Sequence, residues 1–268
     1  MRRPHALSLR ASLSLFVITL SAGPVAGQAE EDKGPDRLLR ILPVGEAPPF
    51  VQKIEGGVRK EQEAPEGSIP PREVVQLTQD GEQEGEPLRL TLDRVSASMP
   101  ARAGTLPLYA SGSGGLDPKP WHKLTVPAKS THSLALLWRD PKEKKWSKAR
   151  SMILVDDINS FPAGSIRFVN VSPWTAIVRL HGKSYSIGAY KTARLRGGLL
   201  KQVPLRVGVR DKNGKLEMVY NAAVNQAAGE RTNVIVYRAD GKAPRRPAKV
   251  RVFRERARLP PPPRPREG

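Results

Sequence analysis

The chain has 268 residues, and its 45 lysines and arginines outnumber its 26 aspartates and glutamates to give a formal net charge of +19. It contains no cysteine, which excludes disulfides, a thiol nucleophile, a cysteine-ligated metal and a lipid-modified N-terminal cysteine. Residues 30–86 hold 14 acids and 7 bases, whereas residues 87–268 hold 12 acids and 35 bases. The basic part favours partners that carry negative charge.

Residues 1–29 have the composition of a secretory signal peptide. Three arginines and no acid precede or border the mostly apolar stretch 11–22, and small residues follow at 25–29. This order predicts cleavage after either Gly27 or Ala29 and a periplasmic or extracellular mature chain. A membrane-spanning helix takes about 20 apolar residues. No other stretch approaches that length, so we expect no transmembrane segment in the mature chain.

Residues 37–157 form the first predicted domain. Short apolar runs at 37–44 and 72–78 predict strands, and three leucines alternate with polar residues in 88–95. A period of two is typical of a strand with one buried face. Trp138 lies in an apolar run and is expected in the core of this domain.

A second domain is predicted over residues 163–240, after a turn-rich segment that ends at Gly164. The run 175–187 reads as two strands joined by a turn at His181-Gly182. An Asn-Gly turn at 213–214 joins two further β-rich runs. Turns of this type between β-rich runs are strong hairpin signals.

No window outside residues 1–29 shows helical periodicity, so the predicted class is all-β, with two antiparallel β-sandwich (immunoglobulin-like) domains. Two stretches that begin at Val126–Thr131 and Ile187–Thr192 share an order of small-residue turn, strand, Arg-Asp turn and strand. This internal repeat favours a duplication. The alternative is that any antiparallel meander repeats strands and turns.

The run Ser165–Pro173 reads S-I-R-F-V-N-V-S-P. It resembles the opening of small exported bacterial β-sandwich domains of unknown function, which begin with a strand ending in an R-x-V-N-x-S-P-like pattern. The resemblance continues through Ala176–Ile187 and covers only the second domain. It implies an immunoglobulin-like or transthyretin-like sandwich and no known activity.

The C-terminal segment 241–268 holds ten bases and two acids and ends in a proline- and arginine-rich run. Such a segment buries little apolar surface and is expected to be a basic, disordered tail. A chain that ends at Asp240 is therefore expected to keep its melting temperature. The alternative is a short edge strand over Lys249–Phe253.

Residues that could carry catalysis are sparse. The three histidines after residue 29 stand apart in the sequence, and no nucleophile-elbow or phosphate-loop motif is present. Asp156-Asp157 reads as a solvated turn between the domains, with a calcium site or paired acids as the alternative. We therefore predict no catalytic, cofactor-binding or metal-binding residues, no cofactor, and no enzymatic activity.

The sequence favours an exported, non-enzymatic accessory or scaffolding protein of the cell envelope. One alternative is a basic module that binds an anionic polysaccharide or lipid surface; another is a hydrolase whose site is not visible in the sequence. An envelope protein is a further expected partner, and nucleic acid is not. The candidate polyanion contacts are Lys144, Lys145, Trp146, Arg245, Arg246, Arg251, Arg254, Arg256 and Arg258.

Overall fold

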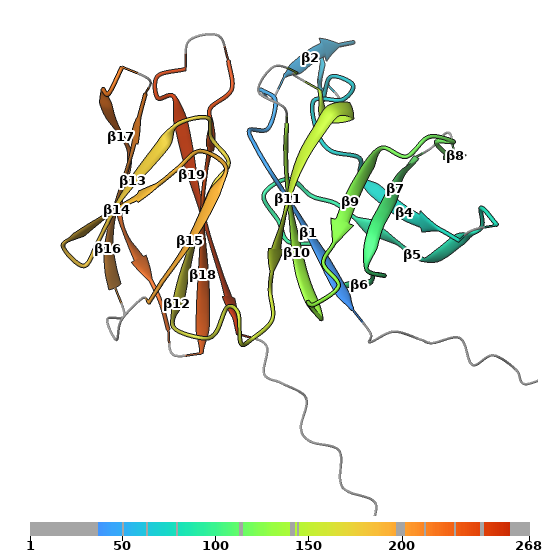
Figure 1. Cartoon of the computed structure of the whole chain (residues 1–268). Coiled ribbons are helices and arrows are strands. Elements are labelled where there is room, and N and C mark those ends of the chain that lie inside the picture. The colour runs from blue at the N-terminus through green and yellow to red at the C-terminus, as the bar shows by residue number, and fades with distance from the viewer. Residues whose placement is uncertain are drawn as a thin grey trace, which may run out of the picture. The chain divides into compact units, whose positions relative to one another are not determined.

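The computed structural model describes residues 37–257 except 50, 63, 79, 113–114, 140–142, 144, 197–201, 212, 228 and 242–243. These residues belong to one compact unit built almost wholly of strands (Figure 1). Within them, no helix is long and apolar enough to cross a membrane. The predicted signal peptide, residues 1–29, lies outside the described part of the chain.

The first half of the unit contains two main sheets and a small hairpin. One sheet has the order β11-β10-β1-β6, with β1 (Leu38–Val44), β6 (Met99–Pro100), β10 (His132–Arg139) and β11 (Ala149–Val155). The other contains β5-β4-β7-β8 with β9 also paired to β7: β4 (Glu73–Leu77), β5 (Gln83–Arg89), β7 (Gly104–Gly112), β8 (Gly115–Leu116) and β9 (His122–Val126). The hairpin joins β2 (Gln52–Glu55) to β3 (Val58–Glu61).

The second half contains two further four-stranded sheets. The order β15-β12-β18-β19 unites β12 (Ser165–Asn170), β15 (Lys191–Arg196), β18 (Glu230–Arg238) and β19 (Ala248–Arg256). The order β14-β13-β16-β17 unites β13 (Thr175–Leu180), β14 (Lys183–Ile187), β16 (Gln202–Arg210) and β17 (Leu216–Asn225). The predicted hairpins are confirmed, since β13 pairs with β14 across His181-Gly182 and β16 pairs with β17 across Gly214.

The two halves repeat one pairing scheme. In each half a parallel pair, β1 with β10 or β12 with β18, is flanked by one antiparallel strand on each side. The segments that the sequence aligned do not occupy equivalent places in this scheme, because Val126–Thr131 leads into β10 and Ile187–Thr192 leads into β15. The immunoglobulin-like character and the duplication stay predictions.

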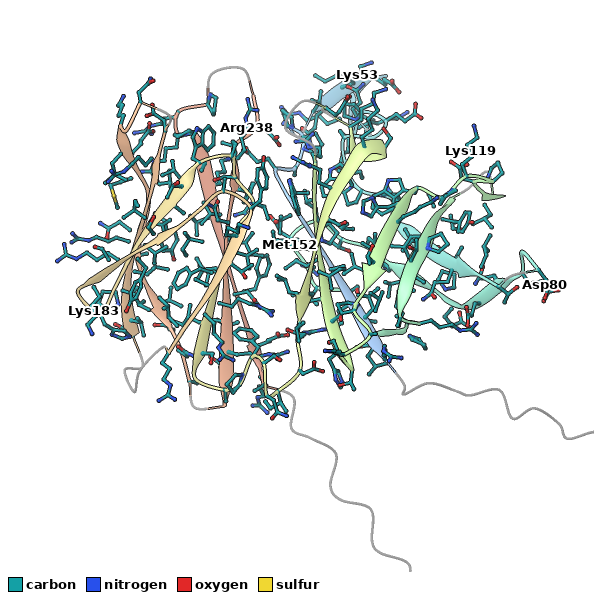
Figure 2. The ribbon with its side chains drawn as sticks, in the orientation of Figure 1. Lys53, Asp80, Lys119, Met152, Lys183 and Arg238 are labelled. Carbon is teal, nitrogen blue, oxygen red and sulfur yellow. The ribbon has the colours of Figure 1, made fainter. Side chains whose placement is uncertain are left out.

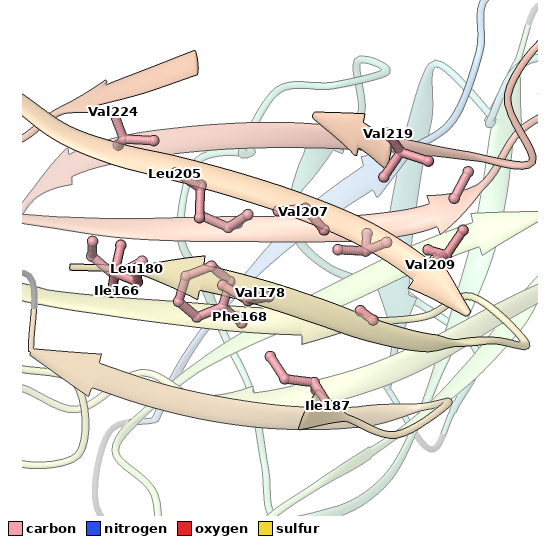
Figure 3. Close-up of a cluster of buried hydrophobic side chains, with 14 of the residues drawn as sticks. Ile166, Phe168, Val178, Leu180, Ile187, Leu205, Val207, Val209, Val219 and Val224 are labelled. Carbon is pink, nitrogen blue, oxygen red and sulfur yellow. The ribbon is translucent and has the colours of Figure 1, made fainter. Parts of the chain in front are cut away.

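Three apolar clusters lie between the four large sheets. The first half encloses one cluster, which includes Leu39, Leu108 and Trp146. The second half encloses another, in which Phe168 and Val178 pack against Val207 (Figure 3). The two sheets that hold the parallel pairs share the third cluster, and we call them the inner sheets. The other two are the outer sheets.

The shared cluster between the inner sheets explains their composition. Leu42 and Trp138 from the first half pack with Val169, Ile235 and other residues of the second half. A sheet buried on both faces needs apolar side chains at successive positions rather than alternating ones. The continuous burial of β1, β10, β12 and β18 follows from this arrangement. The predicted core position of Trp138 is confirmed, with 6% of the residue exposed.

The predicted boundary of the second domain at residue 240 is too early. Strand β19, Ala248–Arg256, pairs residue by residue with all nine residues of β18. Its inward-facing Val250 and Val252 pack on the core of the second half. The alternation of apolar and basic residues in this stretch suits an edge strand with one solvated face, so the prediction of a disordered segment is wrong for Ala248–Arg256.

The predicted strand at 88–95 is also shorter than expected. Strand β5 ends at Arg89, and Asp93 has a positive φ of 58°. Leu88 and Leu90 are buried as the alternation indicated. The chain then leaves its sheet and donates the Asp93 N–H to the carbonyl of Pro43 beside the inner sheet. The alternation therefore predicted the buried leucines correctly, but the strand does not continue to residue 95.

Candidate functional site

A basic groove opens along the edge of the second half, between the edge strands β17 and β19. It has a volume of about 540 Å³. Val219 and Tyr220 of β17 form one wall, and the chain from Pro244 to Arg251 forms the other. Glu46, from the loop after β1, and Asp240 also line it. We name this site the β17–β19 groove.

Four basic residues line the groove: Arg245, Arg246, Lys249 and Arg251. Arg246 donates from Nη1 to the carbonyl of Val219 at 3.0 Å, which fixes its guanidinium against β17. Lys249 pairs with Glu46, and Arg251 Nε lies 2.8 Å from Asp93 Oδ2. Arg245 is exposed, and no hydrogen bond or ion pair with another described residue holds its guanidinium.

Glu46 is held ionised at the margin of the groove. Burial alone would raise its pKa, but hydrogen bonds from Lys249 and from the Asp240 N–H outweigh burial and hold the pKa below its ordinary value. Asp240 is itself paired with Arg139 of β10. The acids of the groove are therefore neutralised by partners on the protein, which leaves Arg245 and Arg246 as the bases available to a ligand.

The structure brings only part of the predicted contact set together. Arg245, Arg246 and Arg251 share the groove, and the sequence missed Lys249, Glu46 and Asp240 beside them. Arg254 lies further along β19, 3.7 Å from Glu230, and Arg256 ends the strand. Lys144 and Arg258 lie outside the described residues. Lys145 lies in the first half, where its side chain borders Gly67.

Trp146 is wrong as a candidate contact. Only 1% of it is exposed, and it belongs to the core of the first half with Leu39 and Leu137. Its backbone N–H donates to the carbonyl of Gly67, and its backbone carbonyl accepts a 2.9 Å hydrogen bond from Trp121 Nε1. The neighbouring lysines suggested a solvated tryptophan, but the short 3₁₀ turn Trp146–Lys148 directs the ring into the core.

Asp156 lies in a buried ion cluster rather than in a solvated turn. Its Oδ2 accepts from Arg40 at 2.5 Å and from Arg231 at 2.8 Å, and its Oδ1 accepts from Arg167 at 2.9 Å. The side chain of Asp156 is 1% exposed. Because three guanidiniums already occupy this carboxylate, the alternative of a calcium ligand or a catalytic acid does not apply to Asp156.

The same cluster joins the two halves. Glu255 of β19 accepts from Arg40 of β1 at 2.6 Å and from Arg231 of β18 at 3.0 Å. The ring of Phe161 lies 4.1 Å from the Arg167 guanidinium carbon and 5.0 Å from that of Arg231. We name these charged residues the Asp156 cluster: Arg40, Asp156, Arg167, Arg231 and Glu255.

Asp157, the neighbour of Asp156, fixes a loop. Its carboxylate accepts hydrogen bonds from the Thr131 hydroxyl at 2.6 Å, the His132 N–H at 2.8 Å and the Ser130 hydroxyl at 3.0 Å. Burial alone would raise the pKa of Asp157, but these hydrogen bonds outweigh burial and lower it. Asp157 therefore positions the turn before β10.

We expect Asp157→Asn to lower the free energy of unfolding by about 2 kcal/mol at neutral pH, because charge-assisted hydrogen bonds to a carboxylate are lost. The carboxylate of Asp157 takes up its proton at a lower pH in the folded chain than in the unfolded chain. The contribution of Asp157 is thus fully present above its ordinary pKa and is lost as pH falls through the lowered folded value. Urea unfolding from neutral to strongly acidic pH should show the two proteins converging. A gap that stays constant into acid would contradict this.

The histidines do not form a metal site. Burial lowers the pKa of His122, which lies on β9 beside Trp121. Among the described residues, no group of three or more histidine, cysteine or acidic side chains could hold a metal ion. In comparisons with known proteins, no family model matches the chain and no curated protein matches it.

Proposed function

We propose that this chain is an exported accessory protein of the cell envelope that acts by binding an acidic polysaccharide in the β17–β19 groove. The observation that carries the proposal is the pair of neighbouring arginines, Arg245 and Arg246, on one wall of an open groove. Export rests on the composition of residues 1–29.

The groove suits a carboxylated or sulfated sugar chain in shape and in charge. Guanidinium groups bind oxyanions through two parallel hydrogen bonds, which a lysine cannot reproduce. Arg246 is held against Val219, so little rotational freedom is lost when it binds an anion. Tyr220, half-buried in the wall from β17, offers a ring surface for the face of a sugar.

The test is a double substitution that removes both positive charges and keeps polar side chains. We expect Arg245→Gln/Arg246→Gln to weaken binding to polygalacturonate and heparin about tenfold, which corresponds to about 1.4 kcal/mol. Binding should also become less sensitive to salt, because fewer counter-ions are released. Fluorescence titration of the full mature chain at two salt concentrations measures both quantities.

Lys123→Gln/Lys129→Gln is the matched control. Both lysines are exposed residues of the first half, away from the groove. The control variant loses the same amount of charge as the groove variant. Its affinity for the polysaccharides should stay within about twofold of the parent, because salt screens charges that lie far from the groove. Equal losses in the two variants would show that net charge alone attracts the polymer, and the groove proposal would then be abandoned.

A further inference from the structure

The outward face of the outer sheet β14-β13-β16-β17 carries a second, separate group of bases. Inward residues of this sheet, such as Val178 and Val207, fill the core, so alternate residues point outward (Figure 3). Figure 2 shows Lys183 at the margin of this sheet, away from the first half. We name the outward set the arginine face: Ile177, Arg179, Arg206, Arg210, Leu216 and Met218.

The arginines of this face are not neutralised within the sheet. Arg179 lies directly opposite Arg206, and their next neighbours across the sheet are Ser184 and Asn221. Arg210 lies opposite Thr175 and Leu216. No ion pair to another described residue engages these three arginines. Like charges placed opposite each other destabilise a sheet, so an anion bound beside these arginines would relieve their repulsion.

Apolar side chains lie between the arginines. Gly208 stands opposite both Ile177 and Met218. A Cβ added at Gly208 would lie 2.9 Å from Leu216 Cδ1 and 3.2 Å from Met218 Sδ, so these two side chains lie across the glycine. Leu216 is 46% exposed and Met218 is 45% exposed. The arginine face therefore combines exposed apolar side chains with guanidinium groups on either side of them.

We propose that the arginine face docks on the surface of an anionic lipid bilayer. Guanidiniums match phosphate headgroups, and exposed apolar side chains between them can enter the boundary between headgroups and acyl chains. The arginines and the exposed Leu216 and Met218 share one sheet face, and a bilayer offers both phosphate headgroups and an apolar region to such a mixed surface, whereas a soluble polyanion offers only charge. The inference is independent of the β17–β19 groove.

Vesicle sedimentation of the full mature chain tests the proposal. We expect binding to phosphatidylcholine vesicles that contain phosphatidylglycerol and little binding to phosphatidylcholine alone. Arg179→Gln/Arg206→Gln/Arg210→Gln should weaken binding to the anionic vesicles on the order of 100-fold, because each basic side chain near such a surface contributes about fivefold. Its melting temperature should stay equal or rise, since the opposed like charges are removed.

A matched triple variant, Arg89→Gln/Lys123→Gln/Lys129→Gln, removes the same charge from exposed positions of the first half. It should bind anionic vesicles within a fewfold of the parent chain. Met218→Ser should weaken vesicle binding while leaving heparin binding unchanged. Equal loss in both triple variants would overturn the proposal. The proposal would also be overturned if the arginine-face variant lost heparin binding but kept vesicle binding. That result would show that the face binds a soluble polymer.

Arg245→Gln/Arg246→Gln separates the two proposals. If the bilayer proposal holds, this groove variant keeps its affinity for anionic vesicles, because neither arginine belongs to the arginine face. A groove variant that loses vesicle binding as strongly as the arginine-face variant would contradict a separate bilayer surface, whatever its effect on polysaccharide binding.

Discussion

Asp156→Ala will lower the free energy of unfolding by about 3–5 kcal/mol, the usual cost of removing one partner from a buried ion pair. Asp156 accepts hydrogen bonds from three arginines, and Arg231 has no exposed surface. After the substitution, Glu255 is the carboxylate still paired with Arg40 and Arg231, and Arg167 keeps only its neutral acceptors on Asn233 and Val155. A buried charge without its partner is far more costly than a broken surface pair.

Urea unfolding followed by tryptophan fluorescence measures this loss. Asp80→Ala is the control, because Asp80 is an exposed loop residue (Figure 2), and its change should stay within about 0.5 kcal/mol. Asp156→Asn tests the role of charge separately, since it keeps the side-chain volume. An Asp156→Ala protein within about 1 kcal/mol of the parent would show that the buried arginines find other partners.

Truncation after Asp240 will abolish cooperative unfolding or lower the melting temperature by more than about 10 °C. This replaces the sequence-based expectation of an unchanged melting temperature. The truncation removes β19, which pairs with nine residues of β18 and contributes the buried Ala248. It also removes Glu255, the second carboxylate of the Asp156 cluster. Both a sheet edge and an ion cluster would be left incomplete.

The control is a chain that ends at Ala257, which keeps all of β19. Residues 258–268 are rich in proline and arginine, so their removal is expected to leave the melting temperature unchanged. Differential scanning calorimetry compares the three lengths. If the chain that ends at Asp240 melts like the longer two, β19 does not stabilise the fold.

Local sequence rules predicted the β-class and the tight turns because those depend on neighbouring residues. The Gly182 and Gly214 turns have positive φ values of 76° and 80°, which glycine adopts without strain. Strand β19 was predicted only as an alternative, over Lys249–Phe253, because its outward bases gave it the composition of a solvated tail. Only the distant apolar partners on β18 and β17 show which of its sides is buried.

The candidate site was predictable only in part for a related reason. Arg245 and Arg246 were selected by charge alone, and the fold places them in a groove with Lys249. Trp146 was assigned to the surface from two adjacent lysines, although its ring is buried. The arginine face was not found, because Arg179 and Arg206 are 27 positions apart and become neighbours only through the register of β13 and β16.

The ion pair between Arg40 and Glu255 has a consequence for the order of folding. The two residues are 215 positions apart in sequence, and β1 pairs with β10 rather than with a sequence neighbour. Contacts of such long separation close late and slow the folding of a chain. During synthesis from the N-terminus, Arg40 of β1 can meet Glu255 only after β19 has been made. We therefore expect the ion pair between Arg40 and Glu255 to be among the last contacts of the fold to form.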